Sequence, residues 1–125
     1  MTQKDLVVLA VDDDLINLKL LKSMLLKTGN VKEVVEAKNG SDAIGVLKGR
    51  NDIDLILLDI IMPIMGGIEM LKVVRADDSL RQLPIIVLTT DETKKAEALE
   101  AGANGFLMKP IRNDELIAKM NTVIV

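Results

Sequence analysis

The chain of 125 residues has a formal net charge of −3, and 49% of its residues are hydrophobic. This length predicts one domain over residues 1–125 that buries roughly two-thirds of the surface of the unfolded chain. Lys and Arg are interspersed with acidic residues, which argues against direct nucleic-acid binding. The absence of Cys excludes disulfides and thiolate catalysis, and the absence of His excludes an imidazole that carries a phosphoryl group.

The first half of the chain predicts two strands and two helices. The apolar run LVVLAV at 6–11 predicts a buried strand, and EVVEA at 33–37 predicts a weaker one. Four leucines between them recur at three- and four-residue steps and predict the buried face of an amphipathic helix, which Gly29 ends. These are Leu15, Leu18, Leu21 and Leu25. Ser41 is the predicted N-cap of a second helix. The apolar residues of that helix are Ala43, Ile44 and Leu47.

The second half predicts three more strands, each followed by a helix. The strands are DLILL at 54–58, IIVL at 85–88 and GFLM at 105–108. The first helix has an apolar face of Ile68, Leu71 and Val74. The second runs from about Glu92 to Ala101, and Gly102 ends it. The third begins at about Asn113, with a buried stripe of Leu116, Met120 and Val123.

A strand followed by a helix thus repeats five times. Parallel strands joined by single helices require right-handed crossovers, so the pattern predicts an α/β fold with a doubly wound sheet and helices on both faces. A strand order of 2-1-3-4-5 would place the first and third strands side by side, but the sequence alone does not fix that order.

Chemically active residues follow four of the five predicted strands. Asp12 and Asp13 follow the first strand, Asp59 the third, Thr89 the fourth and Lys109 the fifth. The carboxyl ends of parallel strands lie at one edge of the sheet, where ligands bind in open α/β folds. We therefore expect these residues to line one pocket whose acids, hydroxyl and amine suit a metal ion and a phosphoryl group.

Three of these acids, Asp12, Asp13 and Asp59, predict a metal site. Carboxylates about 4 to 5 Å apart repel one another by several kcal/mol at an effective dielectric constant near 20 unless a cation lies between them. Oxygen ligands indicate a hard ion, and Mg²⁺ fits best because it takes one or two carboxylates, keeps water and leaves positions for phosphate oxygens. Asp14 is instead predicted to cap the helix that begins at Leu15.

The chain carries four motifs, VDDD at 11–14, DIIMPIMGG at 59–67, LTT at 88–90 and KP at 109–110. In this order and spacing they resemble the motifs of the receiver domains of bacterial two-component response regulators. The length of the chain resembles that of the stand-alone chemotaxis type. The resemblance covers essentially the whole chain. It implies a flavodoxin-like (βα)5 fold for the domain.

The resemblance also implies site roles. Asp59 resembles the phosphoacceptor, which takes a phosphoryl group from the phosphohistidine of a partner kinase or from a small phosphodonor. Asp13, Asp59 and the backbone carbonyl of Ile61 would bind Mg²⁺ directly, and Asp12 would act mostly through a bound water. Lys109 would contact a phosphoryl oxygen and precede a cis peptide bond to the next residue, a proline.

Thr89 and Phe106, the single aromatic residue of the chain, resemble the switch pair of this family. Movement of Thr89 toward the phosphoryl group would vacate space for the Phe106 ring. The surface made by the last two helices and the last strand would thereby change. The helix between them should shift at low cost because most of its apolar residues are alanines.

We therefore expect a phosphorylation-dependent switch rather than a metabolic enzyme, although its own groups assist its phosphorylation and dephosphorylation. The expected partners are a histidine kinase or phosphotransfer protein and a downstream protein target, with the chain a monomer or a weak homodimer on activation. The apolar runs are far shorter than the roughly 20 residues of a membrane helix, and MTQKD at the start lacks the apolar core of a secretion signal. The expected location is the cytoplasm.

Two other functions remain open at this point. One is a haloacid-dehalogenase-type phosphatase, whose DxDx motif after the first strand is matched by residues 12–15. Such an enzyme needs a further acidic pair after a late strand, where this chain has Lys109 and Pro110. The second alternative is a flavodoxin-like binding module that never accepts phosphate. The chain lacks a Gly-rich phosphate cradle of the type G-x-x-x-x-G-K-[ST], so nucleotide binding has no support.

Overall fold

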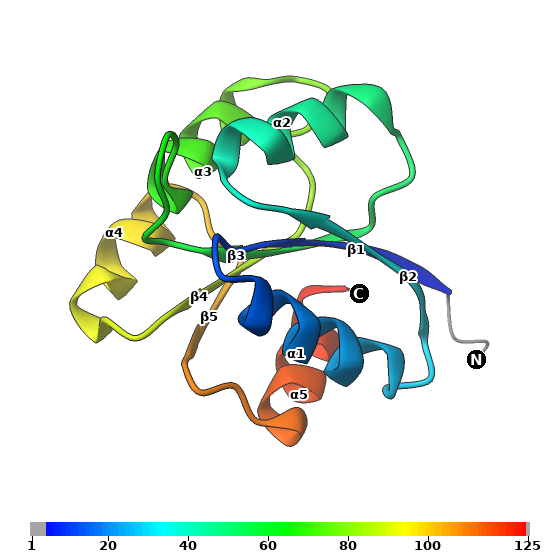
Figure 1. The fold of residues 1–125 in the computed structure, drawn as a ribbon. Coiled ribbons are helices and arrows are strands. Elements are labelled where there is room, and N and C mark those ends of the chain that lie inside the picture. Colours follow the sequence, from blue (N-terminus) through cyan, green and yellow to red (C-terminus); the bar gives the residue numbers. More distant parts are fainter. Residues whose placement is uncertain (1–4, 125) are drawn as a thin grey trace.

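Five strands and the helices between them build an α/β structure, shown in Figure 1 for the computed structural model, which describes residues 5–124. The elements are β1 (Leu6–Val11), α1 (Leu15–Leu26), β2 (Val31–Ala37), α2 (Gly40–Gly49), β3 (Leu55–Asp59), α3 (Gly67–Ala76), β4 (Ile85–Thr89), the 3₁₀ turn η1 (Glu92–Lys94), α4 (Lys95–Glu100), β5 (Gly105–Met108) and α5 (Asn113–Val123).

The strands form one sheet in the order β2-β1-β3-β4-β5, and the neighbouring strands are parallel. This confirms the predicted doubly wound fold and its strand order. β1 and β3 are direct neighbours, with Val11 opposite Leu58. Asp12, which follows β1, and Asp59, which ends β3, therefore emerge side by side at one edge.

Helices cover both faces of the sheet. α1 and α5 lie on one face, and α2, α3 and α4 lie on the other (Figure 1). Alternate residues of a strand supply the two cores, so that Leu9 packs with the α2 side and Val8 with the α1 side. The strands β1, β3 and β4 are buried along their whole length because both faces are covered.

The start of α2 differs from the prediction. Ser41 is not the N-cap; Asn39 takes this position, and its side-chain oxygen accepts a hydrogen bond from the Asp42 amide at 2.8 Å. The Gly40 amide donates to the carbonyl of Met65 at 2.8 Å. This tertiary contact helps to fix where the helix begins, and no local sequence signal reveals it.

The helix predicted from about Glu92 to Ala101 is shorter and divided. A 3₁₀ turn, η1, precedes α4, and the Asp91 side chain caps this turn by accepting a hydrogen bond from the Thr93 amide at 3.0 Å. Within α4, Ala98 alone is buried. Little apolar burial therefore holds this helix, as its alanine-rich sequence predicts.

Smaller differences concern the ends of elements. Leu15 is largely exposed because it is the first residue of α1 and stands at the edge of the sheet, so its predicted place on the buried face is wrong. Val123 is only half-buried at the end of α5. The strand β2 begins at Val31, earlier than predicted, because this residue pairs with Leu6 of β1.

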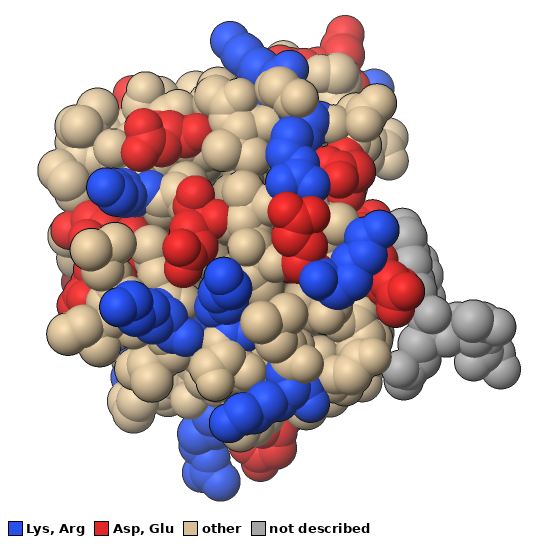
Figure 2. All heavy atoms as spheres, turned by 45° about the vertical axis from the view of Figure 1, so that its right-hand side comes forward, with Lys and Arg blue, Asp and Glu red and all other residues tan. Residues whose placement is uncertain are grey.

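The helices of residues 5–124 are all too short or too polar to cross a lipid bilayer. On the face shown in Figure 2, acidic and basic side chains are interspersed and do not form a continuous basic patch. This charge pattern agrees with the one expected from the composition.

Candidate functional site

A cluster of three carboxylates lies at the carboxyl edge of the sheet. Asp12, Asp13 and Asp59 each offer one oxygen, and these oxygens all lie within 4.8 Å of one another. Asp12 is 1% exposed and Asp59 is 8% exposed, whereas Asp13 is open to solvent. The structure thus brings together the three acids from which the sequence predicts a metal site.

Backbone amides hold two of the three acids in place. One oxygen of Asp12 accepts a hydrogen bond from the Asp14 amide at 2.9 Å, and one oxygen of Asp59 accepts from the Ile60 amide at 2.9 Å. The Asp14 side chain caps α1 by accepting from the Ile16 amide at 2.9 Å, which confirms its predicted role. Backbone donors such as Ile60 carry no sequence signal, so the sequence analysis missed them.

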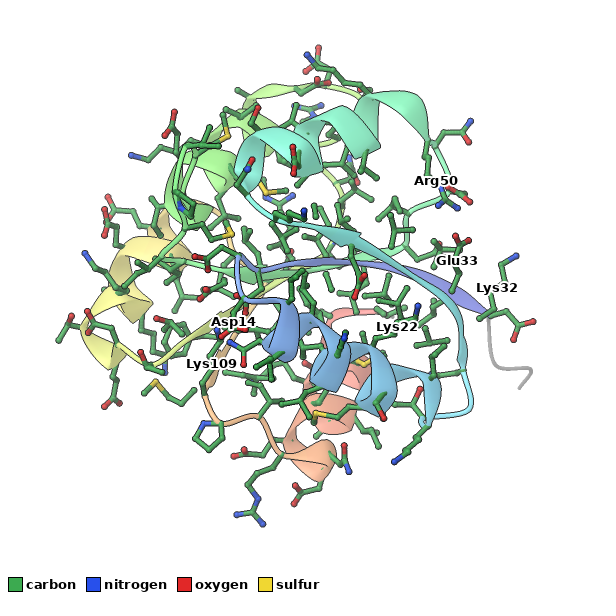
Figure 3. The ribbon with its side chains drawn as sticks, in the orientation of Figure 1. Asp14, Lys22, Lys32, Glu33, Arg50 and Lys109 are labelled. Atoms are coloured by element: carbon green, nitrogen blue, oxygen red, sulfur yellow. The ribbon has the colours of Figure 1, made fainter. Side chains whose placement is uncertain are left out.

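Lys109 supplies the cation beside these acids. Its Nζ donates to Asp12 at 2.9 Å and lies 3.4 Å from a carboxylate oxygen of Asp59. The Lys109 amide donates to the carbonyl of Thr89 at 2.9 Å, which ties the end of β5 to the end of β4. The peptide bond between Lys109 and Pro110 is cis, as expected. Figure 3 shows Lys109 at the end of the molecule remote from Arg50 and Glu33.

Burial and the neighbouring charges act in opposite directions on the ionisable groups of the site. Burial raises the pKa of the Asp59 carboxyl above its ordinary value, the positive charge of Lys109 opposes this shift, and the negative charge of Asp12 adds to it. Burial alone would lower the pKa of the Lys109 ammonium, but its hydrogen bond to Asp12 and the charge of Asp59 outweigh burial and raise that pKa. Lys109 therefore stays charged beside the two buried acids.

Thr89 and Phe106 lie on the neighbouring strands β4 and β5. Thr89 is buried at the end of β4, and its hydroxyl oxygen accepts a hydrogen bond from the Asp91 amide at 3.1 Å. Phe106 lies opposite Val87 in the pairing of β4 with β5, and its half-buried ring packs against the core under α4. The Lys95 ammonium of α4 lies 6.0 Å from the centre of this ring. The loop before α4 is thus bonded to Thr89, and α4 itself contacts Phe106.

The loop after Asp59 approaches the backbone of β3 closely at Gly67. A Cβ atom on Gly67 would overlap the carbonyl oxygen of Asp59 and would lie 2.8 Å from the Cα of Ile60. The Gly67 amide donates to the carbonyl of Ile60 at 2.8 Å, so this contact fixes the path of the loop. Ile61 follows Asp59 by two residues in this loop, and its side chain is 62% exposed.

The donor atoms of the site suit a hard divalent cation. The ligands on offer are carboxylate oxygens, and a single ammonium offsets the charge of only one of three acids. Mg²⁺ prefers such oxygen ligands and retains water at its other positions. The residues present therefore fit this ion.

Comparison with known proteins gives consistent matches over nearly the whole chain. A family model described as the response regulator receiver domain matches residues 8–121. The chemotaxis protein CheY1 of Helicobacter pylori is 36% identical over 119 residues, which cover 93% of this chain and 94% of that protein. The chemotaxis protein CheY-3 of Vibrio cholerae is 34% identical over 122 residues, covering 96% of this chain and 92% of that protein.

Solved structures resemble the fold closely. A putative response regulator from Chloroflexus aurantiacus has a TM-score of 0.89 and 32% identity, with 97% of this chain and 98% of that chain covered. The receiver domain of a sensor histidine kinase from Pseudomonas aeruginosa, solved with a magnesium ion coordinated in its active site cleft, has a TM-score of 0.86 and 28% identity. That match covers 96% of this chain and 98% of the other.

Proposed function

Because the chain belongs to the response regulator receiver domain family, we propose that residues 1–125 form one receiver domain in which Asp59 accepts a phosphoryl group. One observation carries this proposal: the carboxylate at the end of the central strand β3 lies within 4.8 Å of two further acids and 3.4 Å from the Lys109 ammonium. An already ionised carboxylate needs no general base to act as a nucleophile.

The proposed step conserves atoms and charge. An oxygen of Asp59 attacks phosphorus, and the bond from phosphorus to the imidazole nitrogen of a donor phosphohistidine breaks. The electron pair of that bond stays with the imidazole, and Asp59 becomes an acyl phosphate. Catalysis of phosphoryl transfer consists mainly of positioning and of charge stabilisation. We assign the second task partly to Lys109, whose ammonium would move its hydrogen bond from Asp12 to a phosphoryl oxygen.

The metal ligands follow from the same cluster. We propose that Asp13, Asp59 and the Ile61 carbonyl hold Mg²⁺ directly, and that Asp12 acts through a bound water. When bound, Mg²⁺ would supply the positive charge that orients and neutralises the phosphoryl oxygens. The arrangement of the acids supports this assignment, since their oxygens lie within 4.8 Å of one another.

Thr89 and Phe106 are the proposed switch residues. Movement of the Thr89 hydroxyl toward the phosphoryl group would break its 3.1 Å hydrogen bond from the Asp91 amide and so release the loop that precedes α4. The Phe106 ring would turn into the vacated space. Since Ala98 alone is buried within α4, this helix can shift at low cost and change the α4-β5-α5 surface.

The proposed partners are a histidine kinase or phosphotransfer protein that supplies the phosphoryl group and a downstream protein that reads the α4-β5-α5 surface. No direct nucleic-acid contact and no membrane insertion is part of this function. We place the domain in the cytoplasm, as a monomer or as a weak homodimer on activation. The protein acts as a switch that contributes groups to its own phosphorylation and dephosphorylation.

Mapping the phosphorylated residue tests this proposal. With Mg²⁺ and acetyl phosphate, the wild-type protein should gain one acid-stable, base-labile phosphoryl group on Asp59, detected by borohydride reduction and mass spectrometry. Asp59→Asn should gain none, whereas the control Asp14→Asn, which keeps the helix cap, should be labelled normally. Label that persists in Asp59→Asn would refute the assignment.

The phosphatase alternative has no support. In the described chain, β5 is followed by Lys109 and Pro110, not by the acidic pair that such an enzyme needs. A phosphatase would carry its label on Asp12 and turn over phosphate esters rapidly. The same mapping experiment therefore separates the two functions.

We propose that Ile61 slows the loss of the phosphoryl group. Its exposed side chain, two residues after Asp59, offers no polar atom to orient an attacking water. Ile61→Asn should therefore shorten the lifetime of the acyl phosphate, measured from the decay of the label after the donor is removed. An unchanged lifetime would contradict this role.

A further inference from the structure

The loop after Asp59 contains a strained turn centred on Ile64. The Met65 amide donates to the carbonyl of Pro63 at 2.7 Å, and Ile64 between them has a φ of +68°. A γ-turn with positive φ is rare and strained, and a β-branched residue is the least suited to it. Of the non-glycine residues among 5–124, Ile64 alone has a positive φ.

The side chain of Ile64 gains nothing from packing that would offset this strain. It is 82% exposed, the largest value among the exposed large hydrophobic residues of the described chain. Glycine or asparagine adopts positive φ at lower cost and would expose less apolar surface. The fold itself therefore gives no reason for an isoleucine here, which points to a contact outside this chain.

Ile64 is one of four exposed apolar residues that flank the acids. The others are Leu15, Ile16 and Ile61, and we call the four residues the apolar rim. Leu15 and Ile16 open α1 directly after the tandem acids, on one face of the sheet. Ile61 and Ile64 belong to the loop that leads from Asp59 to α3, and α3 lies on the other face. Asp59 itself is only 8% exposed, so a protein that brings a phosphoryl group to it would have these exposed residues of the adjoining segments within its reach.

The chemistry of the phosphohistidine donor indicates which molecule would contact the apolar rim. The chain has no histidine, so a phosphohistidine must belong to a second protein. A phosphoryl group is an anion, and it approaches a site with three acids and one lysine in a chain of net charge −3. Long-range electrostatics therefore disfavours the encounter unless a cation is present, and burial of apolar surface is a source of affinity that does not depend on charge.

We propose that Ile64 is a specificity-determining residue, held in a strained turn so that it contacts the histidine-phosphorylated donor protein while the phosphoryl group reaches Asp59. This inference rests on the proposed function and adds a feature of this chain to it. A small phosphodonor does not bury the rim, so its reaction should not depend on Ile64. The two kinds of donor thus separate docking from chemistry.

The experiment compares phosphoryl transfer from these two donors. The protein donors are the purified histidine kinases of the source organism, each labelled with radioactive ATP, and the one that labels the wild-type protein fastest is used. The small donor is acetyl phosphate with Mg²⁺. Ile64→Asn tolerates the turn but removes the apolar contact, whereas Ile64→Leu keeps apolar bulk without the β-branch. Val73→Asn, at an exposed position in α3, is the matched control.

We expect Ile64→Asn to slow transfer from the kinase about tenfold, as loss of one important interface residue does. Ile64→Leu and Val73→Asn should transfer at nearly the wild-type rate. All variants should react with acetyl phosphate as the wild type does. Ile64→Asn should also melt a few degrees higher, because the strain is relieved.

Two results would overturn the inference. One is a kinase rate that Ile64→Asn leaves unchanged, and the other is an equal loss with kinase and acetyl phosphate, which would mean that the substitution disturbs the site itself. A wild-type protein that neither donor labels would instead overturn the proposed function on which the inference rests.

Discussion

The ammonium of Lys109 donates a hydrogen bond to the carboxylate of Asp12 at 2.9 Å, across 97 residues of sequence. The two residues follow strands β5 and β1, which β3 and β4 separate in the sheet. The bond therefore spans the carboxyl edge directly above the end of β3, where Asp59 lies. In the described structure this lysine supports the site that we assign to phosphoryl transfer.

Removal of this lysine should destabilise the fold. Lys109→Ala leaves the buried carboxylate of Asp12 without its cation, so we expect the free energy of unfolding to fall by about 1 to 3 kcal/mol in metal-free buffer. Urea denaturation measures this change. Lys22→Ala on the exposed side of α1 is the control and should change little. Added Mg²⁺ should raise the stability of Lys109→Ala more than that of the wild type. Equal urea midpoints of Lys109→Ala and the wild type in metal-free buffer would contradict the stabilising role of Lys109.

The ionised side chain of Asp59, the proposed phosphoacceptor, should reduce the stability of the fold. Asp59 is buried next to Asp12, and burial raises the pKa of its carboxyl, so the ionised form is disfavoured in the fold. Asp59→Asn keeps the oxygen that accepts from the Ile60 amide and removes the charge. We expect a gain on the order of 1 kcal/mol without metal, measured by thermal and urea unfolding. Asp14→Asn, at the helix cap, should be neutral, and a loss of stability in Asp59→Asn would count against this reasoning.

Two glycines should respond to alanine in opposite directions. In Gly67→Ala the new methyl group collides with the backbone of Asp59 and Ile60, which cannot yield cheaply, so we expect a loss of about 3 kcal/mol or more. Gly45 lies within α2, and a Cβ there meets nothing within 4 Å. Gly45→Ala should stabilise the fold by up to about 1 kcal/mol through helix propensity. Chemical denaturation of Gly67→Ala and Gly45→Ala tests both expectations. A similar change in the free energy of unfolding for the two variants would show that helix propensity outweighs the backbone collision at Gly67.

Arg75 of α3 should be hard to replace by lysine. Its guanidinium donates four hydrogen bonds of 2.8 to 2.9 Å, to the backbone carbonyls of Arg81, Leu83 and Gly102 and to the side-chain oxygen of Asn104. These bonds join α3 to the loops before β4 and β5. Lysine cannot reach four such acceptors from one nitrogen, so Arg75→Lys should lower stability by roughly 2 kcal/mol. Arg81→Lys is the control, and equal denaturation midpoints for the two variants would contradict the proposal.

The cluster of Arg50, Glu33 and Asp52 should make stability depend on pH. Arg50 lies 2.9 Å from Glu33 and 2.8 Å from Asp52, and its hydrogen bonds hold the pKa values of both carboxyls below their ordinary 4.5 and 3.8. A carboxyl with a lowered pKa stabilises the fold above its unfolded pKa, and this contribution disappears as the pH falls through the lower folded value.

The variant Arg50→Met tests this dependence. Its melting temperature should lie below that of the wild type at pH 6, and the difference should shrink as the pH falls toward about 3. Because the cluster is exposed, added salt should also reduce the difference. A difference that stays constant over this pH range would show that Arg50 acts through packing alone.

The pattern of apolar runs and helical repeats was enough to predict the fold class and the edge at which the active groups gather. It allowed the strand order 2-1-3-4-5 but did not fix it, and the structure decided that order. Periodicity reveals which residues are buried, and parallel crossovers have one hand, so few topologies remained. Asp14 as the cap of α1 was also predictable, because a capping side chain acts on residues close to it in sequence. The resemblance to the receiver family added the expected roles of Asp59, Lys109, Thr89 and Phe106, which periodicity could not supply and which remain proposals.

Other features depended on contacts between distant parts of the chain. The Gly40 amide at the start of α2 donates to the carbonyl of Met65, and the partner of Lys109 is Asp12. The positive φ of Ile64 occurs in a turn without the glycine or asparagine that usually marks such a conformation. Local propensity and periodicity describe how a residue interacts with its near neighbours along the chain. Burial, charge and close approach at this site are set by residues that lie far apart in sequence, so only the tertiary structure decided them.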